Sequence, residues 1–290
     1  MKILFKIIIG LVLTAQCVMG QQDPTFTLYN YNMNVINPAY AGTVEASQLT
    51  ANFRSQWVGI QDAPEIQSFS FASRLGEKVG IGASVVNSTV FVLNETDIYL
   101  DFSYRLQISR YTNLYLGLKA GGSSVNIDLN RVGENNDPLF TENVNRFNPN
   151  VGIGAYLKGE HYFIGVSAPT LLKGERYEKE SGVVTNATNE LHLFANAGYT
   201  FFTNRDIQFT PSFMARFVQG VPFSLDLTGT IDLYEKVELG ISHRLEESIS
   251  AVSFFKIAPW AAFGYAYEHA LTDVGDYSTG THEIMMRFRW

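Results

Sequence analysis

The sequence predicts an all-β protein, a transmembrane antiparallel up-and-down β-barrel of about fourteen strands that follows an extended N-terminal segment. Apolar residues recur at every second position along most of the chain. The connections between these stretches are alternately short and long, and the last stretch ends the chain on an aromatic residue. Successive side chains of a strand point to opposite faces, so each stretch has one apolar and one polar face. A barrel with lipid outside and a polar lumen inside requires this pattern.

Residues 1–20 have the features of a secretory signal peptide. Two lysines precede an apolar run at residues 7–15, which is too short for a transmembrane helix. Small or tolerated residues at Val18 and Gly20 suit cleavage before Gln21. We therefore expect the mature chain to begin at Gln21.

Composition after this cleavage excludes several classes of protein. Cys17 is the only cysteine, so its loss leaves no disulfide, thiol nucleophile or thiolate metal site. A lipid on Cys17 is not expected, because the bulky Gln16 stands where a lipid-attachment motif needs a small residue. Loss of two lysines moves the net charge from −7 to −9, and an acidic surface without a basic tract argues against a nucleic-acid partner. With 13% aromatic residues, 17% charged residues and no later long apolar run, the chain is typical of a barrel.

Residues 21–46 form a lead segment with a different pattern. Asparagines alternate with tyrosines at positions 29–32, another asparagine follows at 34, and Pro24, Pro38 and Gly42 favour turns. We expect an extended, turn-containing segment that lies either inside the barrel lumen or along its periplasmic rim.

Residues 47–290 form the predicted barrel. Between Asp97 and Ile108, six apolar residues alternate with six residues that include two aspartates, an arginine and a glutamine. The same period recurs in residues 207–217 and 223–233. The predicted strands span residues 47–57, 65–75, 79–87, 96–108, 112–123, 148–158, 161–168, 189–202, 206–217, 223–233, 236–245, 249–257, 261–269 and 281–290.

The lengths of the connections support an even strand number. In a bacterial barrel with a periplasmic N-terminus, every even-numbered connection is a short turn and the odd ones can be long. The long connections at residues 58–64, 124–147, 169–188 and 271–280 are all odd-numbered, whereas each even one has two or three residues. This sorting predicts an integral protein of the bacterial outer membrane with both termini periplasmic.

The last ten residues are predicted to close the barrel. Their apolar edge consists of Ile284, Met286, Phe288 and Trp290. Glu283, Arg287 and Arg289 lie on the other edge. A final strand of this kind removes the free edges of a sheet in lipid. The alternative for this stretch alone is an edge strand of a soluble sandwich.

No pattern in the sequence indicates a catalytic, cofactor-binding or metal-binding site. The five histidines are scattered, and His282-Glu283 does not continue as a zinc-binding HExxH motif. Gly165–Pro169 lacks the final glycine of a GxSxG nucleophile elbow. We therefore expect a protein that is not an enzyme and that carries no cofactor or metal.

Several motifs together resemble one family of membrane proteins. They are Ile36–Gly42 (INPAYAG), Phe53–Gly59 (FRSQWVG), Gln67–Ser70 (QSFS), Asn148–Gly154 (NPNVGIG), Tyr162–Pro169 (YFIGVSAP) and Gly280–Ile284 (GTHEI). In this order they resemble the PorP/SprF family of outer-membrane proteins, which belong to the type IX secretion system and gliding motility of Bacteroidetes. The resemblance spans nearly the whole mature chain.

The motif residues are the candidate site. They are Asn37, Pro38, Tyr40, Gly42, Arg54, Gln56 and Trp57. Each could contact a partner or serve the fold alone. In the structural alternative, Asn37 and Pro38 form a turn, Arg54 points inward to a carboxylate such as Asp97 or Asp101, and Trp57 lies at the membrane interface.

The resemblance implies a barrel that binds a specific secreted surface protein through its C-terminal sorting domain. It would support the export, surface attachment or motility linkage of that protein, together with other type IX secretion or motility components. The predicted contact surfaces are residues 37–42 and the loops 124–147 and 169–188, which contain apolar and charged residues. The polar inward faces leave a passive or substrate-specific pore as the alternative.

Overall fold

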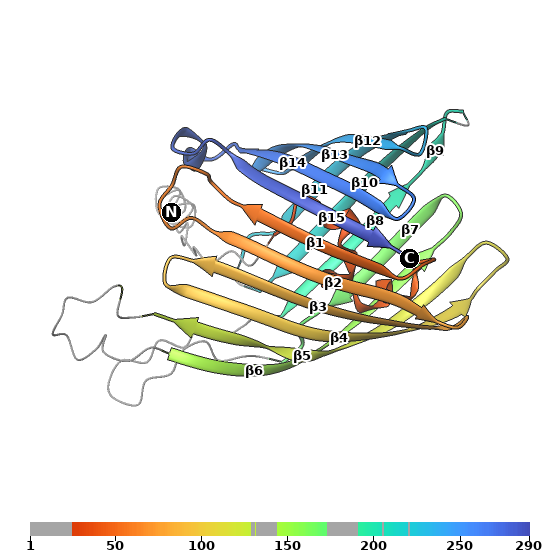
Figure 1. The fold of residues 1–290 in the computed structure, drawn as a ribbon, viewed down its shortest axis with the longest axis horizontal. Helices are drawn as coiled ribbons and strands as arrows, with labels where there is room; N and C mark the ends of the chain where they lie inside the picture. Colours follow the sequence, from red (N-terminus) through yellow and green to blue (C-terminus); the bar gives the residue numbers. More distant parts are fainter. Residues whose placement is uncertain (1–24, 129–130, 132–143, 173–190, 205, 220) are drawn as a thin grey trace, which may run out of the picture.

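The strands form one closed antiparallel sheet (Figure 1). The computed structural model of the protein describes residues 25–128, 131, 144–172, 191–204, 206–219 and 221–290. Its strands are β1 (Gln48–Ser55), β2 (Glu65–Leu75), β3 (Val79–Val90), β4 (Leu93–Gln107), β5 (Asn113–Ile127), β6 (Val144–Lys158), β7 (Tyr162–Ala168), β8 (His192–Tyr199), β9 (Phe201–Phe202), β10 (Ile207–Val218), β11 (Ser224–Leu233), β12 (Val237–Arg244), β13 (Ser248–Ala258), β14 (Ala261–Ala270) and β15 (Thr281–Arg289).

Closure of the ring depends on β15. It pairs with β14 and with β1, and the β1 register runs from Gln48 opposite Arg289 to Ser55 opposite His282. The two-residue β9 pairs with β10 just beyond the end of β8. The sheet is thus a fourteen-stranded barrel with one short extra strand, as the sequence predicts.

The two rims of the barrel differ in the length of their connections. The connections after β2, β4, β6, β11 and β13 lie at one end, which we call the short-turn rim. The chain also ends there, where Ser47 and Trp290 exchange backbone hydrogen bonds of 3.1 and 3.0 Å. The opposite end, the long-loop rim, carries the connections after β1, β5, β7 and β14. One of these includes a 3-10 turn, η5 (Asp273–Asp276).

The largest differences from the predicted strand bounds lie at the long-loop rim. β3 continues to Val90, β4 starts at Leu93, β5 continues to Ile127 and β6 starts at Val144. Stretches such as Asn87–Thr89 have polar residues on both faces, so they lack the alternation by which strands are recognised. Their backbones nevertheless continue the ladder, with Asn87 opposite Thr96. The predicted strand 189–202 is interrupted at Thr200, which separates β8 from β9.

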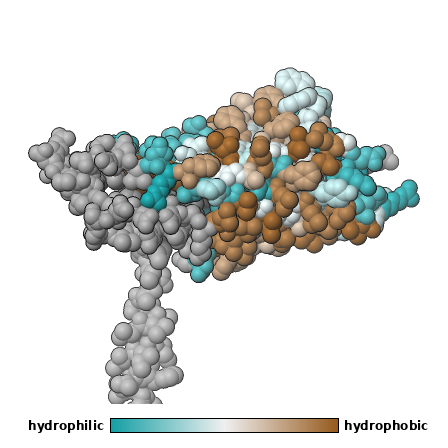
Figure 2. All heavy atoms as spheres, turned by 90° about the horizontal axis from the view of Figure 1, so that it is seen from below, coloured by the Kyte–Doolittle hydropathy of each residue, from teal (hydrophilic) through white to brown (hydrophobic). Residues whose placement is uncertain are grey.

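Exposed apolar side chains form a belt on the outside of the barrel. Figure 2 shows this belt on one face. On β4 it consists of Ile98, Leu100, Phe102, Tyr104 and Leu106, all exposed. On β15 the predicted outward residues Ile284 and Met286 are likewise exposed, which confirms the alternation of the closing strand. Within the described residues, no helix is both long and apolar enough to cross a membrane.

Stacked aromatic rings extend this belt at the short-turn rim. Trp260 stacks on Phe288 and Trp290 on Phe71, each with ring centroids 6.2 Å apart. Tryptophan prefers the boundary between lipid and water, so these pairs suit the edge of the membrane. The inner face, by contrast, is rich in buried serine, threonine, asparagine and charged residues.

The loss of stability caused by a charged residue in the apolar belt should depend on how deep in the membrane that residue lies. Leu100 lies in mid-strand, paired with Ala83 and Ala120, and is 67% exposed to the surroundings of the barrel. Leu100→Arg should destabilise the barrel by about 2–4 kcal/mol, because the guanidinium would sit in hydrocarbon. The matched change Leu106→Arg, on the same face near the short-turn rim, should cost about 0–1 kcal/mol. Urea unfolding of each variant, refolded in lipid vesicles, measures its free energy of unfolding. Equal losses of stability in the two variants would contradict this assignment of the lipid face.

Candidate functional site

The lead segment lies inside the barrel lumen rather than along its rim. From Phe26 to Val44 it is mostly buried, with Leu28, Ala39 and Ala41 fully enclosed. It carries three short helical turns, η1 (Tyr29–Tyr31), α2 (Met33–Ile36) and η2 (Pro38–Gly42). Turns this short leave many backbone N–H and C=O groups without a partner in the segment. Side chains of the barrel wall bind several of these groups.

Arg54 is at the centre of a buried charge network between the barrel wall and the lead segment. Its guanidinium lies 3.1 Å from the Glu268 carboxylate on β14 and 3.2 Å from the Glu283 carboxylate on β15, and Arg54 has no exposed surface. Nη1 of Arg54 also donates a hydrogen bond of 2.7 Å to the Thr27 hydroxyl. The backbone N–H groups of Thr27 and Leu28 donate to Glu283 at 2.7 and 3.2 Å. One buried charge network therefore fixes the beginning of the described lead segment.

Arg54 does point inward to carboxylates, but not to the predicted ones. Asp101 instead pairs with Lys119 on the adjacent strand β5 at 2.8 Å, and Asp97 accepts a hydrogen bond from Ser123. Barrel closure explains the difference, because Arg54 on β1 lies directly opposite Glu283 on β15. The sequence places Glu283 on the inner edge of the closing strand without pairing it with Arg54, and it does not single out Glu268 as a member of the site. The alternation of the last strand, which puts Glu283 on its polar edge, was the one available signal.

Further wall residues hold the lead segment from other sides. The Asn32 amide donates to Ser68 at 3.0 Å and accepts from Ser70 at 2.6 Å, both on β2. Lys119 donates to the backbone carbonyl of Asn34 at 3.4 Å, and Arg287 donates to that of Tyr31. The segment is therefore bonded to strands on several sides of the lumen.

The asparagine-proline motif packs against a wall of glycines. Nδ2 of Asn37 donates to the backbone carbonyls of Ala155 and Val166 at 3.1 and 3.3 Å, and Pro38 is fully buried. A Cβ atom at Gly117 would lie 2.1 Å from the Ala39 nitrogen, and one at Gly80 would lie 2.3 Å from Cα of Gly42. Only glycine permits this close approach.

The other motif residues lie at the two ends of the lumen. Tyr40 makes an edge-on contact with Tyr156, with centroids 5.6 Å apart, close to the short-turn rim. Gln56 is 8% exposed, and its backbone N–H donates to Pro64 across the β1–β2 connection. Trp57 adopts a left-handed φ of 50° and donates from its backbone to the Thr281 hydroxyl at 3.1 Å. Most of the candidate residues thus serve interior or turn contacts in this structure.

The predicted contact loops are described only in part. Residues 129–130, 132–143 and 173–190 lie outside the described residues, and with them most of the predicted contact loops 124–147 and 169–188. Phe147 belongs to β6 and is exposed on the outside of the barrel. Leu171 and Leu172 are exposed next to β6, where their backbone N–H groups donate to Asn150 at 2.9 and 3.0 Å.

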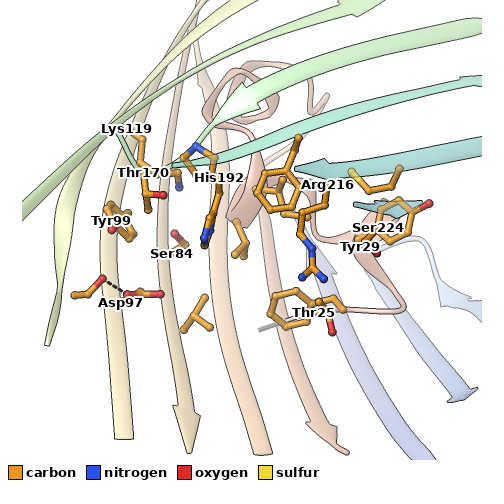
Figure 3. A pocket seen from close by; sticks show the side chains of 18 of the residues that line it. Thr25, Tyr29, Ser84, Asp97, Tyr99, Lys119, Thr170, His192, Arg216 and Ser224 are labelled. Carbon is orange, nitrogen blue, oxygen red and sulfur yellow. Dashed lines mark hydrogen bonds between the residues drawn. The ribbon is translucent and has the colours of Figure 1, made fainter. Parts of the chain in front are cut away.

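A cavity of about 140 Å³ lies between the lead segment and the long-loop half of the wall (Figure 3). Its apolar lining includes Phe26, Val35 and Ile36 of the lead segment and Val86, Phe194 and Met214 of the wall. Together these side chains present a largely apolar surface over the lead segment.

Charged residues of both signs also line this cavity. Glu95 and Asp97 come from β4, whereas His192 comes from β8 and Arg216 from β10 (Figure 3). Arg244, also at the cavity, donates to both carboxylate oxygens of Asp226 at 2.7 and 3.1 Å. In the part of the chain that is described, no group of three or more histidine, aspartate or glutamate side chains is placed to hold a metal ion.

Comparison with solved structures shows the same fold in outer-membrane proteins. The CymD monoaromatic hydrocarbon channel superposes with a TM-score of 0.53 at 10% identity, over 89% of this chain and 92% of that one. Omp33 of Acinetobacter baumannii gives 0.51 at 10% identity, over 84% and 99%. A FadL homologue of Pseudomonas aeruginosa gives 0.51 at 12% identity, over 93% and 95%. At these identities the likeness concerns the outer-membrane barrel fold alone.

Comparison with curated proteins gives no match. The family model of the type IX secretion system membrane protein PorP/SprF matches residues 18–288, which is nearly the entire chain. This match agrees with the resemblance carried by the Ile36–Gly42 and Phe53–Gly59 motifs. The chain has the fold of an outer-membrane barrel and belongs to the PorP/SprF family of type IX secretion system membrane proteins.

Proposed function

We propose that this barrel binds a specific secreted surface protein through the C-terminal sorting domain of that protein. Binding supports the export, surface attachment or motility linkage of the partner, in concert with other type IX secretion or motility components. The barrel itself catalyses no reaction. Family membership supports this assignment to secretion.

The observation that favours binding over conduction is the filled lumen. The lead segment occupies the interior and is bonded to β1, β2, β5, β14 and β15. A passive pore needs a continuous aqueous path, and a segment held by a buried charge network obstructs one. A receptor, by contrast, benefits from a rigid interior that supports its binding surface.

The proposed orientation places the short-turn rim in the periplasm. Ser47 and Trp290 meet at that rim, and short periplasmic turns are typical of bacterial barrels. The long-loop rim then faces outward, and with it the loops in which we expect partner contacts. This arrangement suits a barrel that holds a protein at the cell surface.

Deletion of the gene should change secretion and leave small-solute uptake unchanged. One protein, or a few, should stay unexported or be released into the medium, because their attachment site is missing. Quantitative proteomics of medium, cell surface and periplasm measures this, alongside uptake of a small labelled sugar. Reduced uptake with an unchanged secreted proteome would favour the pore alternative.

Removal of the Arg54 charge should loosen the lead segment. Arg54→Met leaves Glu268 and Glu283 buried without their shared cation, which costs about 3–5 kcal/mol. We expect a lower unfolding midpoint in urea and higher conductance in planar bilayers than for the wild-type barrel.

Arg131→Met is the matched control for this substitution. Arg131 pairs with Asp62 at 3.1 Å at a half-exposed position on the long-loop side, so its loss should cost about 0–1 kcal/mol. A triple variant that combines Arg54→Met with Glu268→Gln and Glu283→Gln should recover part of the stability. Unchanged stability and conductance in Arg54→Met would refute the role of this network.

A further inference from the structure

We propose that the 140 Å³ cavity is an anchor pocket that receives one aromatic or branched aliphatic side chain of the secreted protein. This inference rests on the proposed function, and it names the group that the barrel recognises. The cavity is the hollow above the lead segment that is lined by Phe26, Val35, Ile36, Phe194 and Met214.

The size of the cavity limits what it can hold. Its volume is close to that of the engineered apolar cavity of about 150 Å³ that accommodates benzene. One ring or branched side chain therefore fits, whereas a helix or strand does not. In protein interfaces, a few large side chains buried in such pockets contribute most of the binding free energy.

The polar border of the cavity favours a polypeptide over a hydrocarbon. Tyr99 lines the cavity and is 7% exposed, and its buried hydroxyl has no hydrogen-bond partner among the described residues. Thr170 also lines the cavity, and its buried hydroxyl likewise has no hydrogen-bond partner among the described residues. Buried polar groups without partners cost free energy, and the backbone of an inserted segment supplies both donors and acceptors.

The charges at the cavity point to the same kind of ligand. Acidic and basic side chains are interspersed around the cavity: Glu95 and Asp97 on β4, Lys119 on β5, Arg216 on β10, Asp226 on β11 and Arg244 on β12. Figure 3 shows Asp97, Lys119 and Arg216. A polypeptide can present groups of both signs on either side of the inserted side chain, which a neutral hydrocarbon cannot. Such complementarity fixes the register of a bound segment.

The lead segment closes this pocket on the side away from the long-loop rim. It forms the floor of the cavity, and most wall residues that line it, such as Glu95, His192 and Ser224, come from the long-loop halves of their strands. A group that enters from the long-loop rim therefore stops against Phe26 and Ile36. This geometry suits retention rather than passage.

Filling the pocket tests the proposal. Val86 lines the cavity and is 5% exposed, whereas its neighbour Val85 points out of the barrel. Val86→Phe places a ring in the cavity, and Val85→Phe adds the same ring to the lipid face. The purified full-length mature barrel is tested with the secreted protein that co-purifies with the wild type, and with N-acetyl-4-fluorophenylalanine amide as a probe in fluorine NMR.

We expect Val86→Phe to weaken binding of both the secreted protein and the probe at least tenfold, while Val85→Phe leaves both unchanged. Electrophoretic heat-modifiability confirms that each variant is folded. If Val86→Phe does not fold, Met214→Ala replaces it, since it enlarges the cavity. That variant should then bind the corresponding naphthylalanine probe at least tenfold more tightly than the wild type does.

The outcomes separate the inference from the proposed function. Equal retention of the secreted protein by wild type and Val86→Phe would overturn the anchor pocket and leave partner binding intact. If the probe is lost but the secreted protein is retained, the pocket binds free aromatic solutes and the inference is wrong. If the wild type retains no secreted protein at all, the proposed function fails and the inference fails with it.

Discussion

The need to pair every backbone N–H and C=O group within lipid determines the rest of this structure. Lipid offers no hydrogen-bond partners, so the sheet has to close on itself. Closure brings β15 against β1 and places Arg54 opposite Glu283, residues that lie at opposite ends of the sequence. Glu268 then joins from β14, and the resulting network binds Thr27. The anchor of the lead segment is thus a direct consequence of barrel closure.

Two different kinds of contact hold the lead segment in the lumen. On the side of β14, β15 and β1, buried charges form hydrogen bonds to Thr27 and Leu28. On the side of β3 and β5, glycines at positions 80 and 117 remove side chains, so that Ala39 and Gly42 approach the wall backbone. The charged side chains fix where the beginning of the segment binds, and the glycines make room for its later residues against the wall. A buried pair of this kind adds little net stability by itself, but loss of one partner is costly, so it specifies one position for the segment.

The sequence predicts features that depend on neighbouring residues, such as strand bounds. It does not predict contacts that arise only when the barrel closes. The strand period is a property of neighbouring residues, and β2 was therefore predicted with both of its bounds. The position of the lead segment and the partners of Arg54 depend on which strands become neighbours in space. Asp97 and Asp101 lie on β4, three strands from β1, whereas Glu283 lies on the next strand in the other direction. Alternation alone does not distinguish these carboxylates.

The burial of the Asn37–Gly42 motif changes where the specificity of this barrel should be sought. Asn37 and Pro38 identify the family, yet both are enclosed and bonded to the wall, so they cannot touch a partner in this state. Their effect is indirect, because the segment that they seat also carries Val35 and Ile36 to the floor of the cavity. The interior motif therefore sets the depth of the pocket, and the residues around its long-loop side set what can enter. A change of partner within this fold would then require changes near Val86, Tyr99 and Met214, with the motif left intact.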